Sequence, residues 1–166
     1  MLARPLYRAR QFAQALRPRV DGDRLGVAQA LLGPRASELF LSMSPRDQQH
    51  CLAVYGKLLA TGWTDGEMLA AALLHDCGKG ALAGGPVRLR YRVAYVVVDA
   101  LAPTFLRRLA RCSAGLAVLA EHAERGAELA AKYGATPQSV RLMLAMEAPE
   151  AGDERACALR SADDAC

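Results

Sequence analysis

Apolar residues recur at intervals of about three or four along most of the chain, and this spacing predicts helices. Glycine and proline separate the apolar runs, so we expect several helices of moderate length. In the first run, residues 5–17, arginines lie largely opposite the apolar side chains, which predicts an amphipathic helix packed on the rest of the chain or on a partner. A second short helix, capped by Asp23, is expected to end at Gly33-Pro34, and residues 35–43 add one or two turns.

A serine-proline pair and a threonine-proline pair predict two later helix starts. Ser44-Pro45 and Thr136-Pro137 each place a capping hydroxyl directly before a proline, which suits the first helical position because the amide hydrogen that proline lacks has no partner there. The helix after Ser44 is expected to reach about residue 60, and Gly134 is expected to end the helix that precedes Thr136. A last helix is expected from Glu154 to the end of the chain.

Residues 87–101 are the one segment whose pattern supports two assignments. Alternating polarity and several valines make this segment the best strand candidate in the sequence. A solitary strand has nothing to pair with, however, and no second segment of comparable quality is present, so we expect a helix. Aromatic residues are scarce, at 5%, while alanine and leucine abound, and this composition favours an all-α protein.

The length of 166 residues and the apolar content of 52% suffice for one compact domain with a sizeable core. Within it we expect an amino-terminal helical extension, residues 1–43, packed on a helical unit formed by residues 44–166. The net charge of +4 is too small to indicate specific nucleic-acid binding, but it is compatible with small ligands that carry phosphate. The sequence leaves the oligomeric state open.

Cysteine usage and hydropathy bear on the cellular compartment. The five cysteines are an odd number, include no C-x-x-C pair and lie mostly in apolar helical contexts, which is typical of reduced thiols in a cytoplasm. No apolar run approaches the roughly 18 residues of a membrane span, and no signal-peptide core precedes a cleavage site. The first 20 residues contain arginines and no acids, as a transit peptide does, but a basic surface helix has the same pattern. We therefore expect a cytoplasmic protein without a membrane span.

Candidate chemistry is concentrated in residues 73–80, Leu-Leu-His-Asp-Cys-Gly-Lys-Gly. The preceding Thr-Asp-Gly-Glu has capping-box spacing and predicts a helix that begins at Asp65 and ends near Cys77. His75 and Asp76 then lie in its last turn, where free carbonyl groups and the helix dipole favour a cation. Neighbouring side chains on a helix diverge by about 100°, so both reach one ion only if other elements complete the ligand shell. A hydrogen-bonded core histidine is the alternative.

The sequence His-Asp-x-Gly-Lys, placed after a helix rich in alanine and leucine, resembles the HD-domain metal-dependent phosphohydrolase superfamily. Members of that superfamily carry a His…His-Asp…Asp ligand set on a helical bundle. The resemblance covers roughly residues 44–164 and implies an HD-domain-like helical bundle. It also implies metal-dependent hydrolysis of phosphate esters, usually of nucleotides.

The resemblance implies four ligands for one divalent metal ion: His50, His75, Asp76 and Asp163. His50 precedes His75 by 25 residues and stands on a predicted helix, and Asp163 follows an alanine in the last helix. Asp164 stays an alternative to Asp163 because the phase of that helix decides between them. Two imidazoles and two carboxylates suit Mn²⁺, Fe²⁺, Co²⁺, Ni²⁺ or Mg²⁺, with positions left for water and substrate, better than they suit a closed structural zinc site.

Two further side chains are expected to contact the substrate. Lys79 follows the helix end that carries Asp76, where its ammonium can neutralise phosphate charge, and Asp76 can orient a water molecule whose pKa the metal lowers. Asp76 and Lys79 are therefore the expected catalytic residues. His122 precedes Gly-Ala and a helix, as in HD families, so the resemblance implies that His122 binds substrate phosphate or a second metal. A structural, hydrogen-bonded histidine is the alternative.

The leading functional hypothesis is a metal-dependent phosphohydrolase that acts on a nucleotide or a related small phosphoester. The region around Met146 lacks the histidines that two-metal HD enzymes carry, and Glu147 is the oxygen ligand available there, so one metal or an impaired second site is favoured. The second hypothesis is a catalytically impaired HD module that binds a nucleotide or a protein partner in a regulatory role. An HD-type iron oxygenase, the third, needs two irons and therefore more ligands than the sequence offers.

Overall fold

The computed structural model describes residue 20 and residues 22–83 and 121–166. Every regular element in these ranges is helical, which confirms the expected all-α class. The helices expected at residues 5–17 and 87–101 lie outside the described residues. Within the ranges that are described, no helix is long and apolar enough to cross a membrane.

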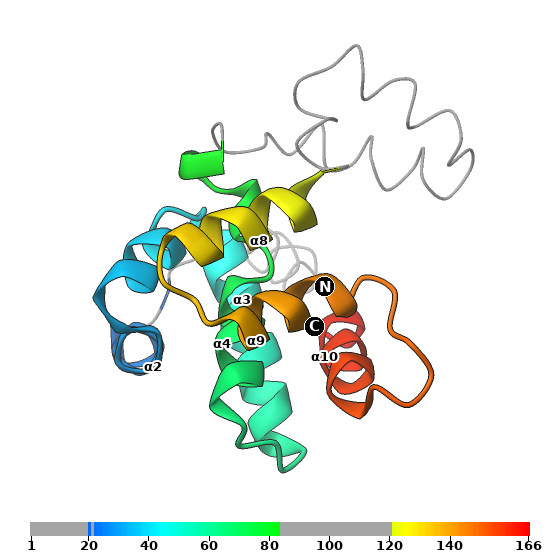
Figure 1. Ribbon diagram of the computed structural model, residues 1–166. Coiled ribbons are helices and arrows are strands. Elements are labelled where there is room, and N and C mark those ends of the chain that lie inside the picture. Colours follow the sequence, from blue (N-terminus) through cyan, green and yellow to red (C-terminus); the bar gives the residue numbers. More distant parts are fainter. Residues whose placement is uncertain (1–19, 21, 84–120) are drawn as a thin grey trace, which may run out of the picture.

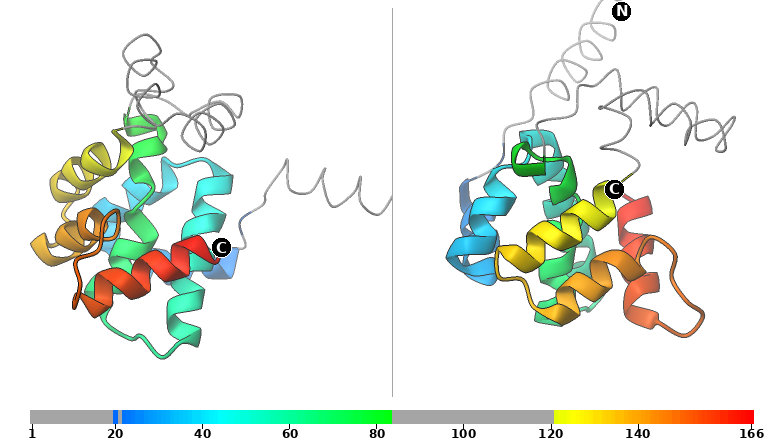
Figure 2. Two further views of the ribbon diagram at one scale, coloured as in Figure 1. Left: turned by 90° about the vertical axis from the view of Figure 1, so that its right-hand side faces the viewer. Right: turned by 45° about the horizontal axis from the view of Figure 1, so that its top comes forward.

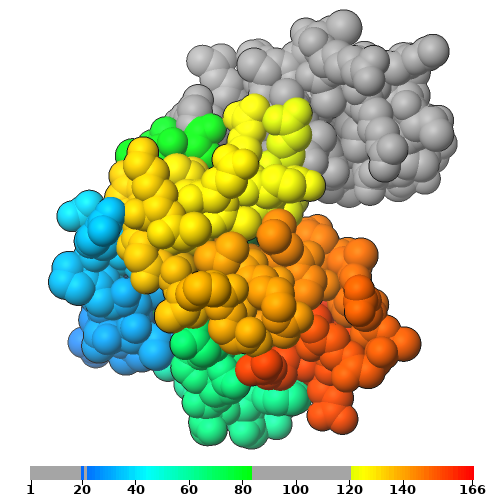
Figure 3. Space-filling model, viewed as in Figure 1, coloured from blue at the N-terminus to red at the C-terminus, as the bar shows by residue number. Residues whose placement is uncertain are grey.

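The apolar helix α4 lies at the centre of the described part of the molecule, and α2, α3, α9 and α10 all contact it (Figure 1). Helix α10 also lies beside α3 (Figure 2), and α8 packs across η1, the turn that follows α4. On the face seen in Figure 3, α8 and α9 form a continuous surface next to α2. In chain order the elements are α2 (Gly22–Leu41), α3 (Pro45–Ala60), α4 (Gly66–Leu74), η1 (Cys77–Lys79), η2 (Ala81–Ala83), α8 (His122–Lys132), α9 (Pro137–Ala145) and α10 (Glu154–Asp164).

Local signals for helix starts and stops hold at several places. The Ser44 hydroxyl accepts a hydrogen bond from the Asp47 amide, and the Thr136 hydroxyl accepts one from the Ser139 amide, so both expected caps are confirmed. Gly134 ends the α8 segment with a φ of 91°, a conformation that glycine adopts without strain. The expected last helix is confirmed as α10.

The break expected at Gly33-Pro34 is a kink within α2. Gly33 has a φ of 69° and a ψ of 176°, so the helical path is interrupted there before it resumes through Pro34. The resumed turns bury Leu39 and Phe40 completely, and Met43 is 3% exposed. These side chains pack against the core that surrounds α4.

The expected bounds of the central helix were wrong at both ends. Asp65, rather than the preceding threonine, is the capping residue, because its Oδ1 accepts a hydrogen bond of 3.0 Å from the Met68 amide. Glu67 does not fold back to complete a capping box; its carboxylate accepts a hydrogen bond of 2.6 Å from the Ser139 hydroxyl on α9. At the other end α4 stops at Leu74, because the backbone leaves the helical path at Asp76 and continues as the 3₁₀ turn η1.

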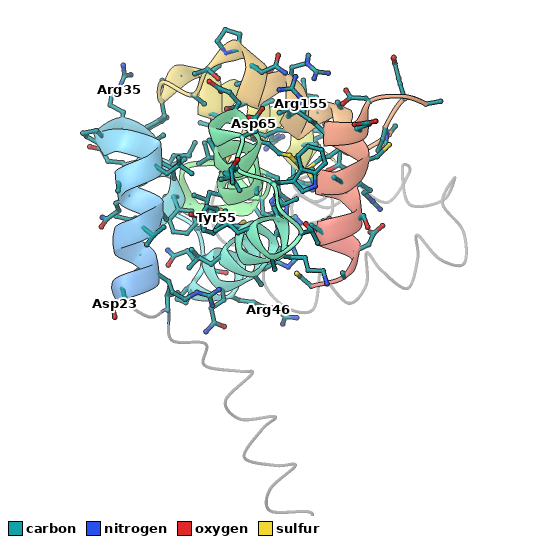
Figure 4. The ribbon with its side chains drawn as sticks, turned by 90° about the horizontal axis from the view of Figure 1, so that it is seen from below. Asp23, Arg35, Arg46, Tyr55, Asp65 and Arg155 are labelled. Atoms are coloured by element: carbon teal, nitrogen blue, oxygen red, sulfur yellow. The ribbon has the colours of Figure 1, made fainter. Side chains whose placement is uncertain are left out.

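Two polar contacts join helices that are distant in the sequence. Arg155 of α10 pairs with Asp65 at the start of α4, with 3.0 Å between Nη1 and Oδ2 (Figure 4). Arg35 of α2 donates a hydrogen bond of 2.8 Å to the carbonyl of Lys132, at the end of α8. Both contacts lie at the surface, so apolar burial around α4 contributes more to stability than they do.

Gly78 permits the closest backbone approach in the described core. A Cβ atom at this position would lie 1.9 Å from the carbonyl oxygen of His122 and 2.9 Å from the amide nitrogen of Gly126. The Cys77 thiol donates a hydrogen bond of 3.3 Å to the Gly126 carbonyl and fixes the same contact. The first turn of α8, which carries His122, is therefore held directly against the turn that follows Asp76.

We predict that Gly78→Ala lowers the free energy of unfolding by about 1–3 kcal/mol, because the added methyl group forces two backbones apart. Gly26→Ala in α2 is the matched control: a Cβ atom there meets nothing within 4 Å, and alanine favours a helix interior by up to about 1 kcal/mol. Urea titration of both variants measures the difference. Equal stability of Gly78→Ala and the unchanged protein would contradict the close approach.

Candidate metal centre

Four of the expected site residues converge from three segments: His50 on α3, His75 and Asp76 after α4, and Asp163 on α10. Asp163 Oδ1 lies 2.7 Å from His50 Nε2 and 3.4 Å from His75 Nε2. Asp76 Oδ1 lies 3.6 Å from His75 Nε2. Donor atoms of His50, His75 and Asp76 all lie within 4.8 Å of one another, a spacing that one metal ion can span.

Burial of the four side chains is graded from the interior to the surface. The His75 and Asp76 side chains are 4% and 5% exposed, whereas those of Asp163 and His50 are 23% and 29% exposed. The cluster therefore has a closed inner side and an open outer side. An open side is what a catalytic metal needs, since water and substrate must reach it.

The His75 ring is oriented by a hydrogen bond on the side away from the cluster. Its Nδ1 lies 2.9 Å from the Ala72 carbonyl oxygen, which can only accept, so Nδ1 carries a proton. Cys51 Sγ lies 3.8 Å from the same nitrogen. The remaining nitrogen, Nε2, points toward Asp76 and Asp163.

His75 Nε2 is the one buried side-chain nitrogen or oxygen of the described residues that has no hydrogen-bond partner. The nearest carboxylate oxygens lie 3.4 and 3.6 Å away, beyond the roughly 2.7–3.2 Å of a direct hydrogen bond, and leaving a buried polar atom without a partner costs about 1–3 kcal/mol. A metal ion would satisfy Nε2 and the facing carboxylates together. The residues present therefore fit a divalent cation.

Neighbouring charges fix the ionisation of both carboxylates. Burial alone would raise the pKa of Asp76, but His75 and Lys79 beside it lower this pKa far below its ordinary value. Burial also opposes ionisation of Asp163, yet the facing His50 and His75 lower its pKa far below the usual range. Both acids are carboxylates at neutral pH, the form that binds a metal ion.

The pKa of His75 moves in the opposite direction. Burial alone would lower it, but Cys51 and the two carboxylates outweigh burial and raise the pKa well above its ordinary value. In the metal-free protein a proton on Nε2 partly neutralises the carboxylates. A metal ion would take the place of that proton, so metal binding releases it.

Lys79 and His122 lie near the same Asp76 oxygen that faces His75. Lys79 Nζ is 2.5 Å from Asp76 Oδ1, and His122 Nε2 is 3.9 Å from the same oxygen. Glu147 does not join the four-residue cluster; its Oε1 lies 3.9 Å from His122 Nε2. His50, His75 and Asp76 thus form one group, Asp163 joins it through the two histidines, and Lys79 and His122 lie next to Asp76.

The sequence left open whether Asp163 or the adjacent Asp164 is the metal ligand, and their positions on α10 differ. Asp163 faces the histidines, whereas Asp164 is 60% exposed and pairs with Arg160, with 3.2 Å between the charged atoms.

Sequence reasoning named neither Cys51 nor Arg160 as a neighbour of the site. Helical periodicity could have placed Arg160 on the Asp163 side, three residues away, but nothing in the sequence marked it.

Comparisons of the chain with protein-family models, with characterised proteins and with solved structures found no match. The side-chain geometry of the described residues and the sequence resemblance are therefore the two observations that bear on function. Of these, the geometry is the independent observation, since it places in one cluster four residues that are separated by up to 113 positions.

We predict that the stability of the metal-free protein is greatest between about pH 5 and 6.5. The lowered pKa values of Asp76 and Asp163 stabilise the fold above the ordinary carboxyl pKa, and this contribution is lost as the pH falls below about 4. The raised pKa of His75 stabilises the fold below the ordinary histidine value, and this contribution is lost as the pH rises through the folded-state pKa.

Urea unfolding in EDTA at successive pH values measures both limbs. Asp163→Asn should flatten the acid limb, and Asp164→Asn, a change of the exposed neighbour, should leave it unchanged. Stability that rises steadily from pH 6.5 to 9 would contradict the direction assigned to the pKa of His75.

Proposed function

We propose that this chain is a metal-dependent phosphohydrolase with an HD-domain-like helical bundle, acting on a nucleotide or a related small phosphoester. The observation that carries the proposal is His75 Nε2, a buried nitrogen without a hydrogen-bond partner among the described residues, aimed at two carboxylates. A second ring nitrogen left without a partner in the core costs about 1–3 kcal/mol, which binding of a partner would recover. A divalent cation is the partner that the surrounding charges favour.

The four side chains indicate the class of metal. Two imidazole nitrogens and two carboxylate oxygens form a mixed set, which suits Mn²⁺, Fe²⁺, Co²⁺, Ni²⁺ or Mg²⁺ with further positions for oxygen ligands. Exposure of His50 and Asp163 leaves those positions accessible from the surface. His50, His75, Asp76 and Asp163 would hold the ion, and one ion per chain is proposed.

The side chains around Asp76 provide the remaining parts of a phosphohydrolase site. A divalent ion, when bound, supplies Lewis-acid activation of water and of a phosphoryl oxygen. Asp76 has hydrogen-bond acceptors with which to orient a water molecule. Lys79 presents an ammonium group beside Asp76, where it can bind a phosphate oxygen as negative charge develops, and His122 offers a second donor.

The Lys79 ammonium and the His122 imidazole also support a small phosphate compound as substrate. Lys79 and His122 are each 18% exposed, so both are accessible yet partly shielded from water. Partial burial strengthens their interaction with an anion.

The division of the chain between residues 43 and 44 stays a prediction, and so does the cytoplasmic location. Helix α2, which belongs to the proposed amino-terminal extension, contacts both α3 and α4.

A second candidate is a regulatory HD module that binds a nucleotide or a protein partner and hydrolyses nothing. One observation favours it: Glu147 faces His122 and lies outside the cluster around His75, so a second metal site is not assembled by the described residues. Metal binding without turnover would support this candidate. The two candidates share the metal centre and differ in whether the bound phosphate compound is hydrolysed.

We predict that the full-length protein binds one Mn²⁺ or Co²⁺ per chain, and that Asp163→Asn weakens this binding by more than about 100-fold. Changes in residues that only support a metal ligand cost about 10–100-fold, so loss of a ligand should cost more. Isothermal titration calorimetry measures both affinities. Asp164→Asn is the matched control and should retain the affinity of the unchanged protein; equal losses in both variants would contradict the proposed ligand set.

We predict that the metal-loaded protein hydrolyses at least one compound in a panel of nucleotides and small phosphoesters, measured as phosphate release. Asp76→Asn should reduce release to background. Lys79→Ala should lower kcat by about 100-fold, the cost of removing one donor that stabilises developing charge. Lys57→Ala, an exposed lysine on α3, is the control. Absence of turnover with Mn²⁺, Co²⁺, Ni²⁺ and Mg²⁺ would contradict hydrolysis and favour the regulatory module.

A further inference from the structure

The Glu147 carboxylate lies between the His122 imidazole and the Arg160 guanidinium. Its Oε1 is 3.9 Å from His122 Nε2, and its Oε2 is 4.0 Å from Arg160 Nη1. The three residues come from the start of α8, the segment just after α9 and the middle of α10. Met146, the neighbour of Glu147, is completely buried, so the backbone that carries Glu147 is anchored.

Neither contact of Glu147 is a close hydrogen bond. Both separations exceed the roughly 2.7–3.2 Å of a direct bond, and the Glu147 and Arg160 side chains are 39% and 40% exposed. Exposed ion pairs of this kind contribute little to stability. Arg160 also pairs with Asp164 at 3.2 Å, so its position does not depend on Glu147. An incoming anion can therefore displace the Glu147 carboxylate at low cost.

The position of the Glu147 carboxylate is close to the candidate metal centre. His122 Nε2 lies 3.9 Å from both Asp76 Oδ1 and Glu147 Oε1, so this ring separates the metal-binding carboxylate from the Glu147 position. A guanidinium binds phosphate in the geometry in which it binds a carboxylate.

We propose that His122 and Arg160 form a second anion subsite, which Glu147 fills in the unliganded protein and a phosphate group of the substrate fills in the complex. This inference rests on the proposed function, because the first phosphate is the one held at the metal centre and Lys79. It assigns the substrate class: a compound with two adjacent phosphates, such as a nucleoside diphosphate, is preferred over a simple monoester. Glu147 sets this preference by competing with weakly bound anions.

The test uses the full chain and inorganic phosphate as the probe, with affinity measured by calorimetry in EDTA and again with Mg²⁺. Glu147→Gln removes the competing charge and should tighten phosphate binding about 3-fold, because exposed charge contacts of this kind are weak. Arg160→Gln should weaken it by a similar factor, and the double variant should behave like Arg160→Gln. In metal-loaded protein, Arg160→Gln should raise the KM for nucleoside diphosphates more than for monophosphates.

Matched controls separate this subsite from general charge effects. Glu150→Gln and Arg141→Gln make the same two changes of charge at exposed positions, and Arg141 pairs with Asp153 as Arg160 pairs with Asp164. Both controls should keep the phosphate affinity of the unchanged protein. Equal tightening in Glu147→Gln and Glu150→Gln would overturn the subsite.

Failure of the subsite and failure of the proposed function give different results. If Glu147→Gln changes phosphate affinity less than about 2-fold while metal binding is intact, the subsite is wrong and the metal centre stands. If Glu147→Gln lowers metal affinity instead, Glu147 is a metal ligand and the subsite is also wrong. Loss of metal binding by the unchanged protein would overturn the proposed function, whereas the phosphate result in EDTA, which needs no metal, would still decide the subsite.

Discussion

A buried imidazole nitrogen that faces two carboxylates is the constraint on which the arrangement of this protein depends. His75 is held by a hydrogen bond from Nδ1 to the Ala72 carbonyl, and its ring cannot turn Nε2 away without losing that bond. Asp76 and Asp163 lie 3.6 and 3.4 Å from Nε2, and two carboxylates that face one buried nitrogen favour a cation between them. A proton on His75 neutralises part of the carboxylate charge, and a divalent metal ion would neutralise more of it.

The packing of the helices places the other site residues next to His75. Helix α4 is apolar on almost every side, so neighbouring helices surround it, and His75 lies at its end between α3 and α10. The short turn after α4 then carries Gly78, whose missing side chain lets α8 approach and places His122 near Asp76. The proposed metal ligands and phosphate-binding donors thus come from α3, α8, α10 and the turn after α4, which pack around one centre. Glu147 and Arg160, whose side chains are partly exposed, lie on the solvent side of His122.

Local chemistry in the sequence was sufficient to predict helix starts at Ser44-Pro45 and Thr136-Pro137, because each cap depends only on nearby residues. It was insufficient at the start of α4: Glu67 bonds to Ser139 on α9, and such a tertiary contact has no local signal. The candidate ligands could be named from a family resemblance, but their convergence depends on helix packing. The contact between Glu147 and Arg160 was not predicted, since two separate segments create it.

The central claim is that His50, His75, Asp76 and Asp163 share one divalent metal ion. A crystal structure of the full chain grown with Mn²⁺, with data collected for anomalous scattering of manganese, tests it most directly. The account predicts a single anomalous peak among these four side chains, with ligand atoms about 2.0–2.4 Å from it. No peak at this position at a saturating Mn²⁺ concentration, with His75 Nε2 bonded to a protein atom instead, would contradict it.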